Sequence, residues 1–381
     1  MKNKRVVHIT TVHNVLDTRI FYKECKSAAK YFEVYLIAPT KENFISNDVK
    51  IINLPQFKNR FIRLVVTNFI AFKKARNLKA DVYHFHDPEF IPWAILLKKF
   101  TNAKVIYDVH EDYFTSIKGK KWINNSIVRN FLAYAFNNLE KRAAKVFDAL
   151  ILAEDYYIEK FNGINKKTVE ILNYPIIYEN KEKINISKNK FLLVYSGTVS
   201  ENRGIWNLLG LAYFLRKKRD DFEIYIIGKV SSDLLLESIN KNLNLNRLLD
   251  TVKIVGGKEY VKREVIDAYH REMDIGLVLI PFSTHYERKM PTKFFEYMLA
   301  GLPIIATNFP RWRDFLDENE CGFAVNPDDF EEIAKYIEYL IENPTLRIKM
   351  GENGKLNVLK KYNWEMEEKK LKKLYEELLN T

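Results

Sequence analysis

The most restrictive feature of this sequence is the repeated alternation of short β-branched runs with longer stretches of helical periodicity. The first example is a β-branched run over 5–11, a helical stretch from Ile20 to Ala29 and a second run over 34–38. A strand, a helix and a further strand in this order form a right-handed βαβ unit with parallel strands. The alternation therefore predicts an α/β protein built on parallel sheets.

The same alternation continues to residue 172 and resumes at residue 191. The expected strands are 5–11, 34–38, 49–54, 82–85, 104–107, 149–152 and 168–172, then 191–196, 222–227, 252–255, 274–279 and 304–306. The expected helices are one after Asp17, 61–78, 89–100, 122–145 and 156–161, then one from Gly204, 232–243, 261–271, one between Pro291 and Gly301, 328–341, 344–361 and 364–379. Such alternation is typical of doubly wound sheets.

The chain is long enough for two domains. Its 381 residues exceed a usual single core, and an apolar content of 47% suffices for two. Pro175 and the lysine-rich run 178–190 interrupt the alternation, which places the domain linker there. We predict a first Rossmann-like domain over 1–177, a second over 178–361 and a C-terminal helix over 362–381.

Composition narrows the environment and the partners. Lys and Arg number 61 against 49 Asp and Glu, a net charge of +12 that suits an anionic membrane surface or phosphorylated substrates. Nucleic acid is not expected, because no basic motif is interleaved with aromatics. Cys25 and Cys321 are far apart, which indicates a reducing cytoplasm. No signal peptide or apolar run of membrane-spanning length is present, so we expect a cytoplasmic protein, with attachment to the inner membrane face left open.

A stretch in the last third carries the strongest functional pattern. Pro291 sits where a helix can begin, and Lys293 and Glu296 point from nearly one face of its first turns. Gly301 ends the helix, and Pro303 prevents its resumption. The helix end and the ammonium attract phosphate, while the carboxylate accepts hydroxyl protons from a sugar ring. On the residues alone, a surface ion pair between Lys293 and Glu296 is an equally good explanation.

A small-residue turn follows the expected strand 191–196. Gly197 and Thr198 would bring backbone amides to a phosphate, and Arg203 offers a planar fork that binds phosphate bidentately. Gly228 and Gly256 follow two further strands and would let a flat base lie against the backbone. By itself the pattern also suits an ordinary α/β turn.

Polar residues follow three strands of the first half, at the sheet edge where parallel sheets bind ligands. These residues are His13, Asp17 and Arg19, then His86 and Asp87, then His110 and Glu111. Asp17 also fits a helix cap, Arg19 a surface residue, and Asp87 a turn before Pro88. His84 and His86 share a strand face, as metal ligands do, but the wider metallohydrolase pattern is absent, so no metal is expected.

The stretch 287–306 resembles the donor-binding helix of retaining glycosyltransferases of the GT-B fold, the group 1 or family 4 type. The residues that carry the likeness are Pro291, Lys293, Phe295, Glu296, Tyr297, Met298, Ala300, Gly301, Leu302, Pro303, Ile304 and Ile305. The resemblance covers nearly the whole chain and is strongest from 191 to 310. It implies two Rossmann-like domains that face a cleft, with a last helix that crosses back.

The resemblance also implies an activity and a site. We expect transfer of a hexosyl or N-acetylhexosaminyl group from a UDP- or GDP-sugar to a glycan or lipid-linked acceptor, in cell-surface polysaccharide biosynthesis, without metal or another cofactor. The expected catalytic residues are His110, Arg203, Lys293 and Glu296. Donor contacts are further expected from Gly197, Thr198, Gly228, Gly256, Met290 and Pro291. The acceptor side is expected to hold His13, Arg19, His86, Asp87 and Glu111.

Two departures from the family pattern leave alternatives open. The turn after the first strand lacks the glycine-rich sequence of many members, and Arg288 stands where many have an acid that holds the donor sugar. The identity of that sugar is therefore left open. A sugar-nucleotide epimerase of the same fold and a non-catalytic, transferase-like binding subunit remain the rival functions.

Overall fold

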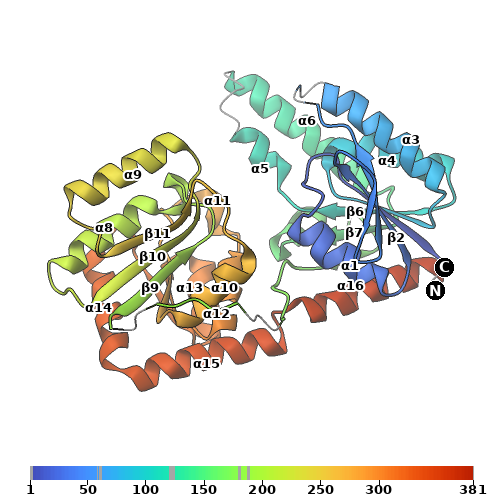
Figure 1. Ribbon diagram of the computed structural model, residues 1–381. Coiled ribbons are helices and arrows are strands. Elements are labelled where there is room, and N and C mark those ends of the chain that lie inside the picture. The colour runs from blue at the N-terminus through green and yellow to red at the C-terminus, as the bar shows by residue number, and fades with distance from the viewer. Residues whose placement is uncertain are drawn as a thin grey trace. The chain divides into compact units, whose positions relative to one another are not determined.

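A computed structural model describes residues 3–57, 59, 62–119, 125–178, 182–186 and 189–380. The chain forms two compact units. The first unit comprises Met1–Ile176 together with Trp364–Thr381, and the second comprises Ile177–Asn363. Figure 1 shows both units as a sheet flanked by helices.

The first unit is built on an eight-stranded sheet in the order β3-β4-β2-β1-β5-β6-β7-β8. Its strands are β1 (Arg5–Ile9), β2 (Glu33–Pro39), β3 (Phe44–Ser46), β4 (Val49–Leu54), β5 (Val82–Phe85), β6 (Lys104–Val109), β7 (Ala149–Leu152) and β8 (Thr168–Glu170). Every neighbouring pair is parallel except β3 with β4. The parallel sheet predicted from the alternation is thus confirmed, and β3 is an unpredicted edge strand.

Helices cover both faces of this sheet (Figure 1). They are η1 (Thr18–Cys25), α1 (Lys26–Ala29), η2 (Arg63–Thr67), α3 (Asn68–Leu78), η3 (Pro88–Phe90), α4 (Ile91–Phe100), α5 (Tyr113–Lys118), α6 (Ser126–Ala144), η4 (Asp155–Tyr157), α7 (Ile158–Phe161) and α16 (Trp364–Leu379). One apolar core joins the sheet to α3, α4 and α6. A second core joins the opposite face to η1, α1 and α16.

The helix predicted over 122–145 corresponds to α6, and its first residues, 122–124, lie outside the described part of the chain. The helix α5, which precedes it, was not predicted. Asn125 caps α6 by accepting hydrogen bonds from the amides of Ile127 and Val128. An asparagine in this position satisfies donors that a helix leaves unpaired at its start, which explains why α6 begins there.

The last helix, α16, belongs to the first unit although it follows the whole of the second in sequence. Trp364 donates its indole N–H to Ser27 Oγ at 2.9 Å, and its amide donates to the Pro175 carbonyl at 2.8 Å. Lys30 pairs with Glu368 at 2.7 Å. These contacts fix the start of α16 over α1.

The second unit is built on a six-stranded sheet in the order β11-β10-β9-β12-β13-β14, with every pair parallel. Its strands are β9 (Phe191–Ser196), β10 (Phe222–Lys229), β11 (Val252–Gly257), β12 (Ile275–Val278), β13 (Ile304–Thr307) and β14 (Gly322–Val325). The strand β14 was not predicted from the sequence. Its short run, Gly-Phe-Ala-Val, gives little periodic signal.

The helices of the second unit complete the layers. They are η5 (Glu201–Arg203), α8 (Ile205–Arg216), α9 (Asp233–Leu245), α10 (Arg263–Glu272), α11 (Thr284–Glu287), α12 (Thr292–Ala300), α13 (Pro310–Glu318), α14 (Phe330–Glu342) and α15 (Pro344–Lys360). The apolar core on one face includes α8, α9 and α14. On the other face α10 and α12 lie against the sheet and against each other (Figure 1).

Close backbone contact fixes the end of α12. Gly301 has φ +76° and ends the helix, as its sequence position predicted. A Cβ on Gly351 of α15 would lie 1.9 Å from the Gly301 carbonyl oxygen, so only glycine lets the two helices approach this closely. This contact holds α12, and with it Lys293 and Glu296, in place.

Candidate functional site

The turn after β9 is shaped by glycines that the fold requires. Gly197 has φ +118°, and Gly204 has φ +84° and precedes α8. A Cβ on Gly204 would lie 1.8 Å from the Leu279 carbonyl oxygen. The segment between these glycines therefore packs directly on the backbone that follows β12, at the carboxyl edge of the sheet where ligands bind in such folds.

Two cationic groups converge on Gly197. A Cβ at this position would lie 3.6 Å from Lys293 Nζ and 4.0 Å from Arg203 Nη1. Lys293 comes from the first turn of α12, is only 7% exposed, and places its ammonium 4.3 Å from the centre of the Tyr195 ring. Both side chains were expected among the catalytic residues, and the structure brings them to one turn.

Neither cation is neutralised by a carboxylate. Within the described part of the chain, Lys293 and Arg203 form no ion pair with Asp or Glu. Burial, and next the Arg203 guanidinium, lowers the pKa of Lys293 to about 7. A bound anion would reverse this effect, because an opposite charge favours the protonated lysine. The geometry is therefore that of an anion site.

The simplest interpretation of the sequence was an ion pair between Glu296 and Lys293, but the structure does not contain this pair. Glu296 pairs instead with Arg263 of α10, which also holds Asp267 at 2.8 Å. Burial alone would raise the pKa of Glu296, but Arg263 and then His270 lower it overall. Glu296 is thus an anionic hydrogen-bond acceptor at the helix beside the anion site. Nothing in the sequence around Arg263 indicated this contact.

A buried polar group supports the base of the turn. The Ser196 amide donates to Tyr297 Oη at 2.9 Å, and His270 lies 2.9 Å from Ser196 Oγ. Burial lowers the pKa of His270 to about 3, so this imidazole is neutral. These contacts connect the end of β9 to α12 and α10, and so position Gly197 relative to Lys293.

The remaining expected donor residues surround this turn or the next. The Thr198 carbonyl accepts from Tyr195 Oη at 2.8 Å, and Pro291 is the N-cap residue of α12, with Met290 before it. A Cβ on Gly228 would lie 2.0 Å from the Gly197 carbonyl oxygen. Gly228 is thus explained by packing, and Gly256 also has a positive φ, at +96°. Contact of either glycine with a base stays a prediction.

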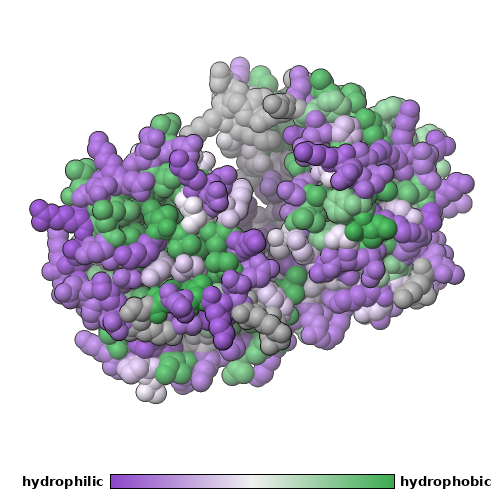
Figure 2. Space-filling view, viewed as in Figure 1, coloured by the Kyte–Doolittle hydropathy of each residue, from purple (hydrophilic) through white to green (hydrophobic). Residues whose placement is uncertain are grey.

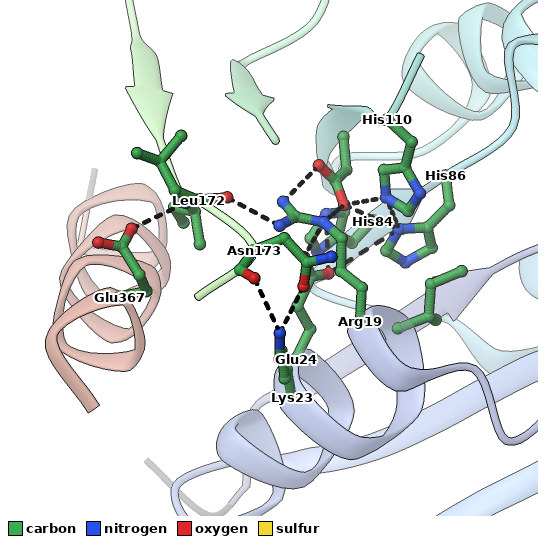
Figure 3. A network of polar contacts seen from close by, with 12 residues as sticks. Arg19, Lys23, Glu24, His84, His86, His110, Leu172, Asn173 and Glu367 are labelled. Carbon is green, nitrogen blue, oxygen red and sulfur yellow. Dashed lines mark hydrogen bonds and ion pairs between the residues drawn. The ribbon is translucent and has the colours of Figure 1, made fainter. Parts of the chain in front are cut away.

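The first unit places polar residues at the carboxyl ends of β1, β5 and β6. His110 Nε2 contacts Asp108 Oδ2 and lies 3.3 Å from His86 Nδ1, and its side chain is 11% exposed. Asp108 also binds Arg19 through two nitrogens, at 3.1 and 2.9 Å. Figure 3 shows Arg19, His86 and His110 close together. Of the group, His110 is the member that reaches the surface.

His13 lies beside His110, with ring centres 5.3 Å apart. Its Nε2 is 3.4 Å from Asp87 Oδ1, and Asp87 accepts hydrogen bonds from Thr10 Oγ1 at 2.8 Å and the Thr11 amide at 2.6 Å. These bonds shape the turn after β1. The structure therefore brings His13 and His110 together at one edge of the sheet.

Three expected acceptor-side residues are buried instead, which corrects their placement. Arg19 is 5% exposed, and its guanidinium binds Asp108, Glu24 and the Ile171 carbonyl. His86 and Asp87 are each 1% exposed and bind neighbouring polar groups. A charged or polar side chain after a strand can point into the interior when buried groups there bind it. The sequence alone does not show which groups these are.

Two other residues lie as the sequence suggested. Asp17 caps the helix that starts with η1, accepting from the amides of Arg19 and Ile20. Glu111 is exposed next to His110. Asp108 was not chosen from the sequence, although its spacing of two from His110 on a strand was the available signal, because it puts both on one face.

The fold defines the class of protein. Over 99% of this chain and 100% of the other, the structure matches sucrose-phosphate synthase from Thermosynechococcus elongatus, with a TM-score of 0.75 and 16% identity. It also matches HepE of Anabaena, solved in complex with UDP and glucose, over 98% and 100% of the two chains, with a TM-score of 0.70 and 12% identity. The chain has the GT-B fold.

The sequence comparisons add the family. Residues 177–357 match the family described as "Glycosyl transferases group 1". An uncharacterized glycosyltransferase of Methanocaldococcus jannaschii is 23% identical over 376 residues, 92% of this chain and 91% of that protein. The capsular polysaccharide biosynthesis glycosyltransferase CapM of Staphylococcus aureus is 24% identical over 218 residues, 57% and 53% of the two chains. Residues 177–357 thus match the group 1 glycosyltransferases, as the resemblance predicted.

Regarding membranes, none of the helices in the described residues has the length and apolar character needed to span a bilayer. Figure 2 shows hydrophilic residues over much of the visible surface of both units, with apolar residues between them.

Proposed function

We propose that this glycosyltransferase uses a nucleotide-diphosphate sugar, with UDP or GDP as the nucleotide, and transfers the sugar with retention of configuration. The observation that carries the proposal is the convergence of Lys293 and Arg203 on Gly197, at a sheet edge where neither cation forms an ion pair with a carboxylate of the described residues. A diphosphate supplies the two negative charges that this pair lacks. Arg203 binds it bidentately, and Lys293 acts as a point charge.

Glu296 would bind the ribose hydroxyls of the donor. Its pairing with Arg263 holds the carboxylate ionised, so both oxygens can act only as acceptors. Ribose offers two neighbouring hydroxyl donors, which a single carboxylate can receive. Arg263 thereby orients Glu296.

The same two cations supply the chemistry. When the bond between the anomeric carbon and the diphosphate oxygen breaks, negative charge grows on the leaving group, and Lys293 and Arg203 stabilise it. The acceptor oxygen bonds to the same face of the sugar, and its proton passes to an oxygen of the leaving phosphate. No side-chain nucleophile is needed, and the reaction proceeds without a metal ion at the diphosphate.

We further propose that His110 takes part in transfer. It is the member of the histidine and carboxylate group of the first unit that reaches the surface, and Asp108 fixes its ring. His13 beside it would assist on the acceptor side. The expected effect of His110→Asn is a loss of turnover with little change in nucleotide affinity.

The acceptor is proposed to be a glycan or a lipid-linked sugar of a cell-surface polysaccharide. CapM and the putative glycosyltransferase EpsD of Bacillus subtilis are relatives that support this class. Exposed apolar side chains on α6, such as Ile127 at 77% and Phe131 at 69%, suit contact with a lipid surface.

The decisive experiment is a screen of UDP- and GDP-sugars for thermal stabilisation of the purified protein, followed by product analysis. We expect one nucleotide class to stabilise the protein and the matching sugar to be transferred, with the donor's anomeric configuration kept in the product. Added Mg²⁺ should leave the rate unchanged.

The rival functions give different results in the same screen. An epimerase converts the nucleotide sugar to an isomer without any acceptor. A binding subunit is stabilised by the nucleotide but forms no product with a broad acceptor set. If no nucleotide sugar stabilises the folded protein, the donor site proposed around Gly197 is wrong.

A further inference from the structure

The inner face of the first sheet carries a cluster of polar side chains in an apolar core. His8 on β1 lies directly opposite His84 on β5, and His86 follows on the same face. Glu24 reaches these histidines from η1. All four side chains are 0–1% exposed, and an apolar core surrounds them together with the buried charged residues Arg19 and Asp108. Such a cluster needs an explanation, because buried polar groups without partners cost stability.

His8 Nδ1 lies within hydrogen-bond distance of His86 Nε2, at 3.0 Å, but Glu24 faces the three histidines without bonding to them. Glu24 Oε2 lies 4.0 Å from His8 Nδ1, 3.7 Å from His84 Nε2 and 3.8 Å from His86 Nδ1. These distances are too long for hydrogen bonds. Glu24 Oε2 and His84 Nε2 form no hydrogen bond with any described residue, although both atoms are buried. Four polar groups therefore surround one point that none of them fills.

The spacing suits a metal ion. One donor atom from each of His8, Glu24, His84 and His86 lies within 4.8 Å of the others. Zinc bonds of about 2.0–2.1 Å place tetrahedral ligand atoms roughly 3.4 Å apart. Among these atoms His8 Nδ1 lies 3.0 Å from His86 Nε2 and 4.0 Å from Glu24 Oε2, and His84 Nε2 lies 3.7 Å from Glu24 Oε2. No separation exceeds 4.8 Å. A water with four hydrogen bonds would hold the same atoms roughly 4.6 Å apart.

The charges of the region also call for a cation. Arg19 Nε is 3.1 Å from Glu24 Oε1, and Arg19 Nη2 is 2.9 Å from Asp108 Oδ1. One guanidinium thus faces two buried carboxylates, which leaves an excess negative charge away from water. A proton on Glu24 is the competing way to remove it, since burial and then Asp108 raise the pKa of Glu24. A divalent ion removes the charge and also binds the histidines.

Each histidine has the outer partner that metal-bound histidines usually have. Tyr375 Oη lies 3.1 Å from His8 Nε2 and 2.7 Å from His84 Nδ1. Asp108 Oδ2 lies 3.1 Å from His86 Nδ1. These contacts orient the rings from outside the cluster. Figure 3 shows Glu24 beside His84 and His86.

We propose that His8, Glu24, His84 and His86 bind one divalent transition-metal ion of the zinc type in a closed, structural site. The ion joins β1, β5 and η1, and through Tyr375 it fixes α16. The pair His84 and His86 alone gave no reason to expect a metal, because the other two ligands come from distant parts of the sequence. The site takes no part in transfer, so it stands independently of the proposed function.

The first test uses the full-length protein without an affinity tag. After dialysis, elemental analysis should find about one zinc-type ion per chain. Protein depleted of this ion and reloaded with Co²⁺ should show the visible absorption of tetrahedral cobalt. This measurement needs no substitution, so it decides the question even if the variants below fail to fold.

Variants then assign the ion to the cluster. Glu24→Gln removes the ligand charge at nearly the same size, and we expect loss of the cobalt spectrum. Tyr375→Phe removes an outer contact and should weaken metal affinity about 10–100-fold. Matched controls are Glu140→Gln and Tyr157→Phe, which change a buried glutamate and a buried tyrosine of the same unit outside the cluster. Both controls should keep wild-type metal affinity.

Two results would overturn the proposal. One is a folded wild-type protein with no ion and no cobalt spectrum, which would show that a proton on Glu24 neutralises the cluster. The other is an ion whose affinity is the same in wild type, Glu24→Gln and Tyr375→Phe, which would place it elsewhere on the protein.

Discussion

The two units carry charged side chains at the same kind of sheet edge but neutralise them differently. In the first unit, Arg19 and Asp108 are buried and bind each other through two hydrogen bonds. In the second, Lys293 and Arg203 share a turn with no carboxylate partner among the described residues. The Arg19–Asp108 pair is formed within the chain, and we expect it to stabilise the fold. The two cations of the second unit would pair only with an anion from outside, and this difference is the basis of the proposed donor site.

The comparison also shows how a cost in stability can indicate function. Placing a lysine beside an arginine in a buried position is unfavourable, and the lowered pKa of Lys293, at about 7, expresses that cost. Proteins retain such arrangements where binding or catalysis uses them.

The largest expected effect is on activity when the unpaired cations are removed. Lys293→Ala should reduce turnover by about 10²–10³-fold or more, because it removes charge that stabilises the leaving diphosphate. Glu296→Ala should likewise abolish transfer by loss of donor binding. Circular dichroism should show an intact fold in both. Lys241→Ala, an exposed lysine on α9, is the control and should retain full activity. Activity that survives in Lys293→Ala would contradict the proposal that the cations of the second unit bind the donor diphosphate.

Removing a paired charge of the first unit should instead reduce the stability of the protein. Asp108→Asn replaces one of the two buried carboxylates that bind Arg19 by a neutral amide, whose nitrogen cannot accept a hydrogen bond from the guanidinium. We expect a decrease of about 3–5 kcal/mol in the free energy of unfolding. Urea denaturation would measure it. Glu318→Gln breaks the exposed pair with Lys361 and should change stability by no more than about 0.5 kcal/mol. A similarly small effect for Asp108→Asn would show that the first network is not a stabilising one.

The lowered pKa of Lys293 should make the stability of the protein depend on pH. Because the folded pKa of Lys293 is about 7 and that of unfolded lysine is near 10.5, the unfolded chain binds more protons between these values. The stability of the unliganded protein should therefore rise with pH in this window relative to Lys293→Met, by up to about 1.4 kcal/mol per pH unit. Unfolding of both proteins at several pH values would measure the difference.

Nucleotide binding should change in the opposite direction across the same window. A diphosphate needs the protonated lysine, so affinity for UDP or GDP should fall above about pH 7, by at most about tenfold per pH unit. Calorimetry should detect proton uptake on binding. The same pH dependence in Lys293→Met would assign the titration to another group.

The smallest expected effect concerns the lipid surface. The positive charge of the chain and the exposed residues Ile127, Phe131 and Tyr134 of α6 predict weak binding to anionic vesicles that salt removes. Replacing Phe131 by serine should reduce binding a few-fold in a sedimentation assay. Leu245→Ser, on α9 of the second unit and 73% exposed in wild type, should not change it. No vesicle binding at low salt would remove a membrane surface from the proposed partners.

Much of the fold was predictable, because alternating strands and helices leave a regular pattern. The parallel sheets and the ends of α12 at Pro291 and Gly301 followed from local signals. The short strand β3 did not, since three residues carry no measurable period. The helix α6 was predicted within a few residues of its ends, whereas the six-residue helix α5 was not predicted, since so short a segment shows little helical period.

The site was predictable only where one local segment carries the pattern. Gly197, Arg203 and Lys293 each lie in a recognisable strand-end or helix-start motif. The ion-pair partners of the charged side chains could not be predicted from the sequence. Arg263 meets Glu296, and Arg19 meets Asp108, only because separate helices and strands are packed together. Their roles in transfer stay predictions.

The position of α16 has a consequence for the order in which the protein is made. Translation completes every strand of both sheets before it reaches Trp364 and Tyr375, which help to close one face of the first sheet. Until then the nascent chain leaves exposed the part of that apolar face that α16 covers. The first unit therefore acquires α16 only after the second sheet has been synthesised, and a chain stopped before Trp364 leaves the first unit incomplete, however well the second has folded.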